Sequence, residues 1–272
     1  MDIPNKQLVD SNTNLRVMLS SDNSNIVYNL KSNSPNIDDI QLSAVIEQFS
    51  HLFLPYSTPD YTKLSSFTPN IHSHMIVTEG NPISFKPRRL NPCIANLVKK
   101  ELQKLLSAGV ISPSKSQWAT PLHYVTKQNT EGQIISIRLV GDYRALNKIT
   151  IADNFSIPNI RDFSANLHNK KYFSTLDLQS AFHHIPLEES SREKTTLATP
   201  FGNFQYNYLP FGLRNASAAF MRFITSILGD LDYVFIFLDD ILVASKTKEE
   251  HIEHVKEIFV RLDKFQLKYF LL

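Results

Sequence analysis

The sequence has little cysteine, little glycine and no long apolar run. Cys93 is the only cysteine among 272 residues, so no disulfide can form within the chain and no cysteine-based zinc site can be assembled. Seven glycines are too few for a glycine-rich low-complexity segment. No stretch of about 18 consecutive apolar residues occurs, which predicts that no helix spans a membrane and that no membrane partner is involved.

A secretion signal is also lacking. The N-terminal sequence MDIPNKQLVD has no basic start followed by an apolar run, so we expect no signal peptide. The remaining composition is ordinary, with 42% hydrophobic and 20% charged residues, as in soluble globular proteins. The length suffices for one large domain or two modest ones with a buried core.

Charge is unevenly distributed, although the formal net charge is only +2. Residues 1–60 carry 3 basic and 7 acidic side chains, whereas residues 70–148 carry 11 basic and 4 acidic ones. A local basic surface favours a polyanionic partner such as nucleic acid. An ordinary solvated face rich in lysine gives the same counts. Charge alone therefore does not distinguish such a face from a nucleic-acid-binding surface.

Periodicity divides the chain into regions. Residues 1–36 are rich in Ser and Asn without a clear apolar period, and predict a linker or a poorly ordered arm. Residues 37–69 predict a helix that starts at 37 and an extended connector marked by prolines. From residue 70 onward, strands and helices follow in mixed order, which predicts the α+β class with helices on one face of a sheet.

Several elements carry local signals. Asn91 and Pro92 suit the start of a helix that ends at Gly109, and segments 121–127 and 134–140 predict a hairpin. The other predicted elements are a strand at 173–178, a helix at 179–184, strands around 196–208, a helix after Asn215, two strands within 233–244, and a helix opening at Thr247 with Glu250 as its capping box.

Aspartates interrupt two of these apolar strands. Asp239 and Asp240 lie within the run from Tyr233 to Ala244, and Asp177 lies in the strand at 173–178. Burying unpaired carboxylates is costly, so each site is either solvated, as at a hairpin tip or strand end, or binds cations. If the two strands lie side by side, the carboxylates converge on a hard oxygen site suited to Mg²⁺, as in two-metal phosphoryl transfer.

Five segments in one order resemble the reverse transcriptase of gypsy-type LTR retrotransposons. They are Trp118-Ala-Thr-Pro121 with Lys127, Arg138-Leu-Val-Gly-Asp-Tyr-Arg-Ala-Leu-Asn147, Ser174-Thr-Leu-Asp-Leu-Gln-Ser-Ala-Phe182, Leu209-Pro-Phe-Gly-Leu-Arg-Asn215 and Phe237-Leu-Asp-Asp-Ile-Leu-Val243. The resemblance covers roughly residues 70–272. It implies a right-hand polymerase with fingers at about 90–150, a palm at about 151–272 with a ferredoxin-like sheet, and RNA-directed DNA polymerase activity.

The resemblance also implies a metal site. Asp177 and Asp239 match the principal metal ligands, Asp240 matches the third carboxylate, and the backbone carbonyl of Leu178 completes one shell. The implied cofactors are two Mg²⁺ ions, with Mn²⁺ as an alternative. The implied partners are an RNA or DNA template with its primer, dNTP, and other parts of a Pol polyprotein.

Further matched positions imply a nucleotide site. Lys127 and Arg138 match the fingers residues that grip the dNTP triphosphate, Phe182 matches a steric gate beside the sugar, and Phe211 and Gly212 match the segment along the nascent base pair. The local sequence alone leaves other interpretations open. The two cations fit an ordinary hairpin surface, Phe182 fits a core position, and the segment Pro210-Phe-Gly212 fits a plain turn.

The chain departs from the family pattern at several points. Phe237 stands where the family usually has Tyr, and Ser217 stands where it usually has Pro. The family continues into a thumb, RNase H and integrase, so we expect a piece truncated before a complete thumb. Residues 2–17 faintly resemble the tail of the element's protease. By family analogy alone, the location is cytoplasmic.

Clustered carboxylates also occur in proteins with other functions. A catalytically inactive, nucleic-acid-binding remnant of the same fold is the main alternative. A nuclease or integrase also uses clustered carboxylates, but does not place an Asp-Asp pair on a hairpin beside triphosphate-gripping cations. An aspartic protease lacks support because no Asp-Ser/Thr-Gly triplet occurs.

Overall fold

The structure, a computed structural model, describes most of the chain in two compact units. The described residues are 7–9, 16–18, 26–29, 40–53, 73–129, 131–156, 167–178, 181–237, 240–265, 267 and 269–270. Unit 1 comprises Met1–Thr68, Phe155–Gln179 and Met221–Leu272, and unit 2 comprises Pro69–Asn154 and Ser180–Phe220. Each unit is described by itself.

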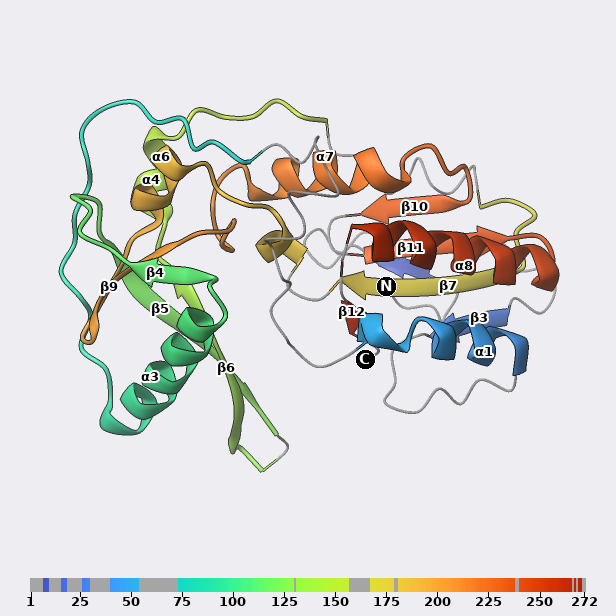
Figure 1. The fold of residues 1–272 in the computed structure, drawn as a ribbon, viewed down its shortest axis with the longest axis horizontal. Coiled ribbons are helices and arrows are strands. Elements are labelled where there is room, and N and C mark those ends of the chain that lie inside the picture. The colour runs from blue at the N-terminus through green and yellow to red at the C-terminus, as the bar shows by residue number, and fades with distance from the viewer. Residues whose placement is uncertain are drawn as a thin grey trace. The chain divides into compact units, whose positions relative to one another are not determined.

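Unit 1 is built on a mixed sheet, which places the chain in the α+β class as the sequence predicts. Strands β10 (Val234–Phe237), β11 (Asp240–Ser245), β7 (Tyr172–Leu178) and β12 (Tyr269–Phe270) follow one another in that order, with antiparallel neighbours. Strand β3 (Ile26–Asn29) pairs with β7 in parallel. The strand with Asp177 is therefore paired directly with β11 (Figure 1).

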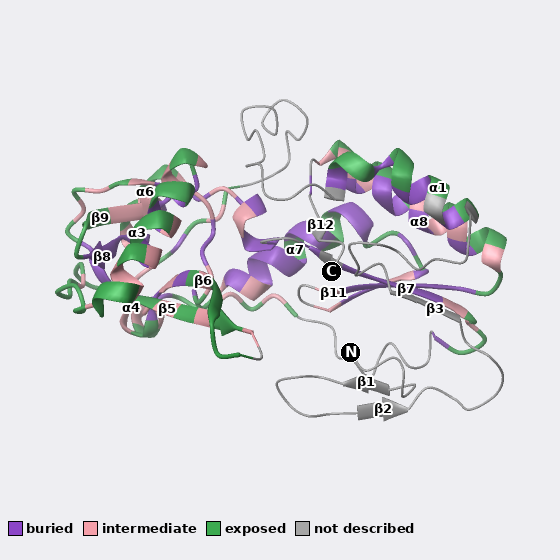
Figure 2. Cartoon of the chain, turned by 90° about the horizontal axis from the view of Figure 1, so that it is seen from below, coloured by how far each residue is buried: buried purple, intermediate pink, exposed green. Residues whose placement is uncertain are grey.

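Helices α1 (Ile40–Gln48) and α8 (Lys248–Lys264) lie on the same side of β7 and β11 (Figure 2). A short 3₁₀ helix, η1 (Ser50–Phe53), follows α1. The rings of Phe49 and Phe259 lie 5.6 Å apart between the two helices. Helix α1 starts at Ile40 rather than at the predicted residue 37, and residues 37–39 lie outside the described part of the chain.

The capping box predicted for α8 is present. The Thr247 hydroxyl accepts a hydrogen bond from the Glu250 backbone N–H, and the Glu250 carboxylate accepts one from the Thr247 backbone N–H. This reciprocal pair satisfies two donors that the first helical turn leaves unpaired. The buried stripe of α8 consists of His251, Val255, Ile258, Phe259 and Leu262.

Unit 2 contains a second sheet, in the order β4-β9-β8-β5-β6. Its strands are β4 (Ile111–Pro113), β5 (Thr120–Gln128), β6 (Ile134–Gly141), β8 (Leu197–Thr199) and β9 (Gly202–Tyr206). Strands β5 and β6 form the predicted hairpin, with a register shift between Lys127 and Gln128. This hairpin carries Lys127 and Arg138, the two cations that the family resemblance assigns to the triphosphate.

Unit 2 also holds α3 (Pro92–Ser107), which begins and ends as predicted. The Asn91 side chain accepts a hydrogen bond from the Cys93 N–H at 3.0 Å. Gly109 has φ +65°, a left-handed conformation that ends the helix at little cost for glycine. The shorter helices are α4 (Arg144–Ile149), α6 (Glu189–Arg192) and η3 (Glu193–Thr195), and α7 (Ala216–Leu228) contributes residues to both units.

Some elements differ from the sequence prediction. The helix predicted at 179–184 is a 3₁₀ turn, η2 (Ala181–His184), in its described part, because so short a segment cannot nucleate a stable α-helix. Strands β1 (Gln7–Val9), β2 (Arg16–Met18) and β3 lie in the segment expected to be a linker. Strands of three or four residues are too short for periodicity to reveal.

None of the helices in the described ranges is long and apolar enough to cross a membrane.

Gly141, at the end of β6, provides a test of packing in unit 2. A side-chain carbon there would overlap the ring of Tyr143, which is buried and donates a hydrogen bond to the Thr195 carbonyl at 2.9 Å. We expect Gly141→Ala to destabilise the protein by about 1–3 kcal/mol through overpacking, measured by urea denaturation. Ser136→Ala, an exposed change on the same strand, is the control. Equal stability of the two variants would contradict the predicted overlap.

Candidate active site

The carboxylate site predicted from the sequence depends on the register between β7 and β11. The two strands are antiparallel, and Asp177 is the direct cross-strand partner of Asp240. Asp240 is the first residue of β11 and is partly exposed. The structure therefore places position 177 opposite Asp240, one of the two adjacent aspartates that the sequence analysis singled out.

The other predicted metal ligands are only partly described. Asp239 lies outside the described residues, as does the side chain of Asp177. Leu178 ends β7, is 3% exposed and pairs with Tyr269 of β12. No group of three or more His, Cys, Asp or Glu side chains gathers within the part of the chain that the structure describes, so the three-carboxylate site stays a prediction that the register supports.

Lys127 and Arg138 lie on one face of the hairpin. Arg138 is paired across the strands with Val125, and Lys127 with Ser136. Residues at i and i+2 of a strand share a face, and directly paired residues share it too. The two cations are thus diagonal neighbours, and both are exposed, which leaves their charges available to an anion.

Four of the predicted nucleotide residues meet around the ring of Phe211. The Arg138 guanidinium carbon lies 5.1 Å from the Phe211 ring centroid, within range of a cation–π contact. Phe182 meets the same ring edge-on, with centroids 4.9 Å apart and an interplanar angle of 82°. Phe182 is 8% exposed and also contacts Phe220, so its burial fits the core interpretation, and the steric-gate role stays a prediction.

The fourth residue is Gly212, which has φ +90°. This conformation favours glycine, because a side chain there is strained whatever the space around it. Gly212 lines a groove of about 560 Å³ together with His123, Val125, Val140 and Asn147, among others. The groove therefore opens on the hairpin face that carries Lys127 and Arg138, because its lining residues His123 and Val125 lie four and two positions before Lys127 on β5.

Sequence reasoning missed the residues that hold the Phe211–Gly212 segment in place. The Asn147 amide donates to the Gly212 carbonyl and accepts from the Arg214 backbone N–H, both at 2.8 Å. Asn215 donates to the Ile151 carbonyl at 2.7 Å. The two Asn147 bonds join the second and the fourth of the five family segments, and the signal that could have revealed them is that both segments end in asparagine.

Asp142 was also missed. Its carboxylate accepts two hydrogen bonds from Arg144, at 2.7 Å each, and one from Arg88 at 2.5 Å. These guanidiniums, Arg144 first, outweigh the opposing effect of burial and hold the pKa of Asp142 well below its usual range. Asp142 therefore stays charged and fixes two arginines at the wall of the groove.

Comparisons with known proteins agree with this arrangement. The family described as "Reverse transcriptase (RNA-dependent DNA polymerase)" matches residues 125–269. The chain therefore belongs to the reverse transcriptase family, as a domain of the type found in LTR retrotransposons.

The relatives are Pol polyproteins. The retrovirus-related Pol polyprotein from transposon 297 of Drosophila melanogaster is 35% identical over 205 residues, which cover 75% of this chain and 19% of that protein. The one from transposon gypsy of the same species is 38% identical over 170 residues, or 61% of this chain and 16% of that protein. The chain thus spans less than a fifth of the length of these curated relatives.

Solved structures share the fold. The foamy viral protease-reverse transcriptase in complex with an RNA/DNA hybrid has a TM-score of 0.74 at 23% identity, covering 89% of this chain and 31% of that one. The foamy viral protease-reverse transcriptase dRH in complex with double-stranded DNA has a TM-score of 0.71 at 22% identity, covering 89% of this chain and 41% of that one. These similarities support the fingers-and-palm fold predicted from the sequence.

Proposed function

We propose that this chain acts as an RNA-directed DNA polymerase, transferring nucleotides from dNTP to a primer 3′-hydroxyl on an RNA or DNA template. The observation that carries the proposal is the β7–β11 register, which pairs Asp177 with Asp240 in a chain of the reverse transcriptase family. In an antiparallel pair, directly opposed positions lie about 5 Å apart at Cβ. That separation suits two carboxylates that share cations.

Two divalent cations, Mg²⁺ with Mn²⁺ as an alternative, are the proposed cofactors. Their proposed ligands are Asp177, Asp239 and Asp240 with the Leu178 carbonyl. Oxygen donors of this kind are the ligands that Mg²⁺ prefers, and family membership implies divalent-metal use. When bound, such ions activate the attacking hydroxyl and neutralise the leaving pyrophosphate.

The exposed face of the hairpin is the proposed triphosphate site. Lys127 supplies a point charge and Arg138 a planar fork that can hold two phosphate oxygens at once. The stacking of Arg138 on Phe211 orients that fork before the nucleotide arrives, which reduces the ordering cost of binding. Phe182 and Gly212 are the proposed contacts to the sugar and the nascent base pair.

The proposed nucleic-acid partner is a template annealed to a primer. Two observations support it: the excess of basic residues in 70–148, and the presence of an RNA/DNA hybrid and of double-stranded DNA in the complexes of the foamy viral relative. Other parts of a Pol polyprotein are proposed as further partners, because the relatives are polyproteins.

Primer extension tests the proposal. The chain is incubated with an RNA template, a labelled DNA primer, dNTP and Mg²⁺, and Asp239→Asn is the matched variant. We expect extension that requires the divalent ion and is lost in the variant. Binding of primer–template without any extension would instead identify an inactive remnant. Cleavage of the nucleic acid without dNTP would identify a nuclease.

A further inference from the structure

A buried histidine bridges the two strands that carry Asp177 and Asp240. On α8, His251 places Nε2 2.7 Å from the Ser174 hydroxyl of β7 and Nδ1 2.9 Å from the Ser245 hydroxyl of β11. His251 is 1% exposed, and both serines are fully buried. One imidazole ring therefore contacts both strands through directional bonds in the interior of unit 1.

The bridge acts diagonally across the strand pair. Ser174 is the cross-strand partner of Val243, and Ser245 is the partner of Tyr172. A sliding of β11 along β7 moves Ser174 and Ser245 relative to each other, so a single ring can reach both hydroxyls only in one register. Sliding would leave buried polar groups unpaired, which folded proteins avoid.

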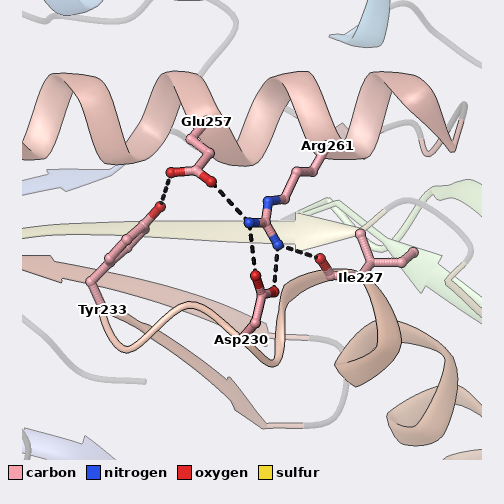
Figure 3. A network of polar contacts seen from close by, with 5 residues as sticks. All are labelled: Ile227, Asp230, Tyr233, Glu257 and Arg261. Atoms are coloured by element: carbon pink, nitrogen blue, oxygen red, sulfur yellow. Dashed lines mark hydrogen bonds and ion pairs between the residues drawn. The ribbon is translucent and has the colours of Figure 1, made fainter.

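The surrounding residues anchor α8 to the start of β10 as well. The Ser245 hydroxyl also lies 2.8 Å from Nδ1 of His254, whose ring stacks on that of Tyr233 with centroids 3.5 Å apart. The Tyr233 hydroxyl donates to Glu257 at 2.6 Å (Figure 3). The helix is thus bonded to β7, to β11 and to the residue that precedes β10.

Arg261 closes this network at the surface. Its guanidinium donates to Glu257 at 2.9 Å, to the carboxylate of Asp230 and to the Ile227 carbonyl at 3.0 Å (Figure 3). Helix α8 therefore cannot shift along the sheet without breaking charge-assisted hydrogen bonds. Because the helix is held in place, His251 can hold the two strands in a defined position.

The bridge adds a directional constraint to the apolar packing of α8. The other buried residues of α8, such as Val255 and Phe259, contact their neighbours without directional preference. A slip of two residues keeps every side chain on its original face of the sheet, so its apolar cost is a loss of close fit. The same slip also leaves the buried hydroxyls and imidazole of the bridge unpaired.

We propose that His251 is a positioning residue for the active site: by bridging Ser174 and Ser245 it fixes the strand register that sets Asp177 opposite Asp240. That these carboxylates bind metal ions rests on the proposed function. The strand register is argued independently, from the hydrogen bonds within unit 1. Ser174 lies three positions before Asp177 on β7, so a displacement of the strand at Ser174 also displaces Asp177.

The first measurement addresses the register. Cross-strand nuclear Overhauser contacts between backbone protons of Leu176 and Ile241, partners in the present register, are recorded on the full chain with selectively labelled Leu, Ile and Val. We expect His251→Leu to weaken these contacts and to add contacts between Leu176 and Val243, which a two-residue slip brings together. Val255→Ala, a buried change on the same helix, should keep the original set despite its lower stability.

The second measurement is Mn²⁺ affinity, followed by electron paramagnetic resonance of the free ion. We expect His251→Leu to weaken Mn²⁺ binding on the order of tenfold or more, as replacements of residues that support metal ligands do. Val255→Ala, which leaves the bridge intact, should bind Mn²⁺ as the original chain does. His251→Gln retains one donor and one acceptor and should recover part of the loss.

The outcomes separate the two proposals. Unchanged Leu176–Ile241 contacts in His251→Leu, or equal Mn²⁺ loss in Val255→Ala, would overturn the role of His251. Absence of Mn²⁺ binding in the original chain would count against the proposed function, while the register measurement still decides the role of His251. Should His251→Leu not fold, Ser174→Ala removes one end of the bridge and carries the same expectation.

Discussion

Asp177→Asn is expected to reduce the rate of nucleotide addition by roughly 10³-fold, because several kcal/mol of charge stabilisation depend on the metal site. The amide keeps the shape of the carboxylate but removes its charge. Asp240→Asn should also be impaired. The double variant should be little worse than Asp177→Asn alone, since groups that act as a unit are not additive. Single-turnover primer extension measures all three.

Asp232→Asn is the matched control for this experiment. Asp232 is an exposed aspartate in the turn before β10, and its replacement changes the net charge by the same amount. We expect near-normal extension from it, and unchanged primer–template binding by every variant. Extension by Asp177→Asn within tenfold of the original chain, or an equal loss in Asp232→Asn, would remove position 177 from the proposed site.

Arg138→Ala is expected to lower kcat/KM for dNTP on the order of 10–100-fold, which corresponds to the loss of one or two charge-assisted hydrogen bonds. Most of the effect should fall on KM, because the guanidinium is proposed to bind the triphosphate before and during the reaction. Steady-state kinetics with varied dNTP at saturating primer–template measures it.

Two further variants make this result specific. Arg138→Lys keeps the charge but loses the planar fork and its stacking on Phe211, so we expect only partial recovery. Lys100→Ala removes an equal charge from an exposed position on α3, away from the groove residues. A loss of dNTP affinity in Lys100→Ala as large as in Arg138→Ala would point to general charge rather than to a triphosphate contact at Arg138.

The elements that the sequence predicted well are those whose signals are local. The capping box of α8 and the cap, proline and glycine of α3 involve residues within a few positions of one another. The β5–β6 hairpin has its turn in the sequence between the two strands. In each case the residues that start or end the element lie within or next to the segment itself, so a short stretch of sequence is enough to predict it.

What the sequence left undetermined depends on contacts between distant segments. The run from 233 to 244 predicts strands, but not that Asp240 rather than a neighbour is paired with Asp177. Similarly, neither the parallel pairing of β3 with β7 nor the Asn147–Gly212 bond has a local pattern. The roles of Lys127, Phe182 and Phe211 came from family resemblance, and they remain predictions.

The division of the chain bears on how it folds during synthesis. Unit 2 is complete once Phe220 has been made, whereas unit 1 combines its earliest residues with Met221–Leu272. Because domains fold as the ribosome releases them, unit 2 can fold while β7, already translated, still awaits β11. The strand with Asp177 must therefore remain unpaired on that side until β11 has emerged, which leaves an open sheet edge exposed to wrong partners in the meantime.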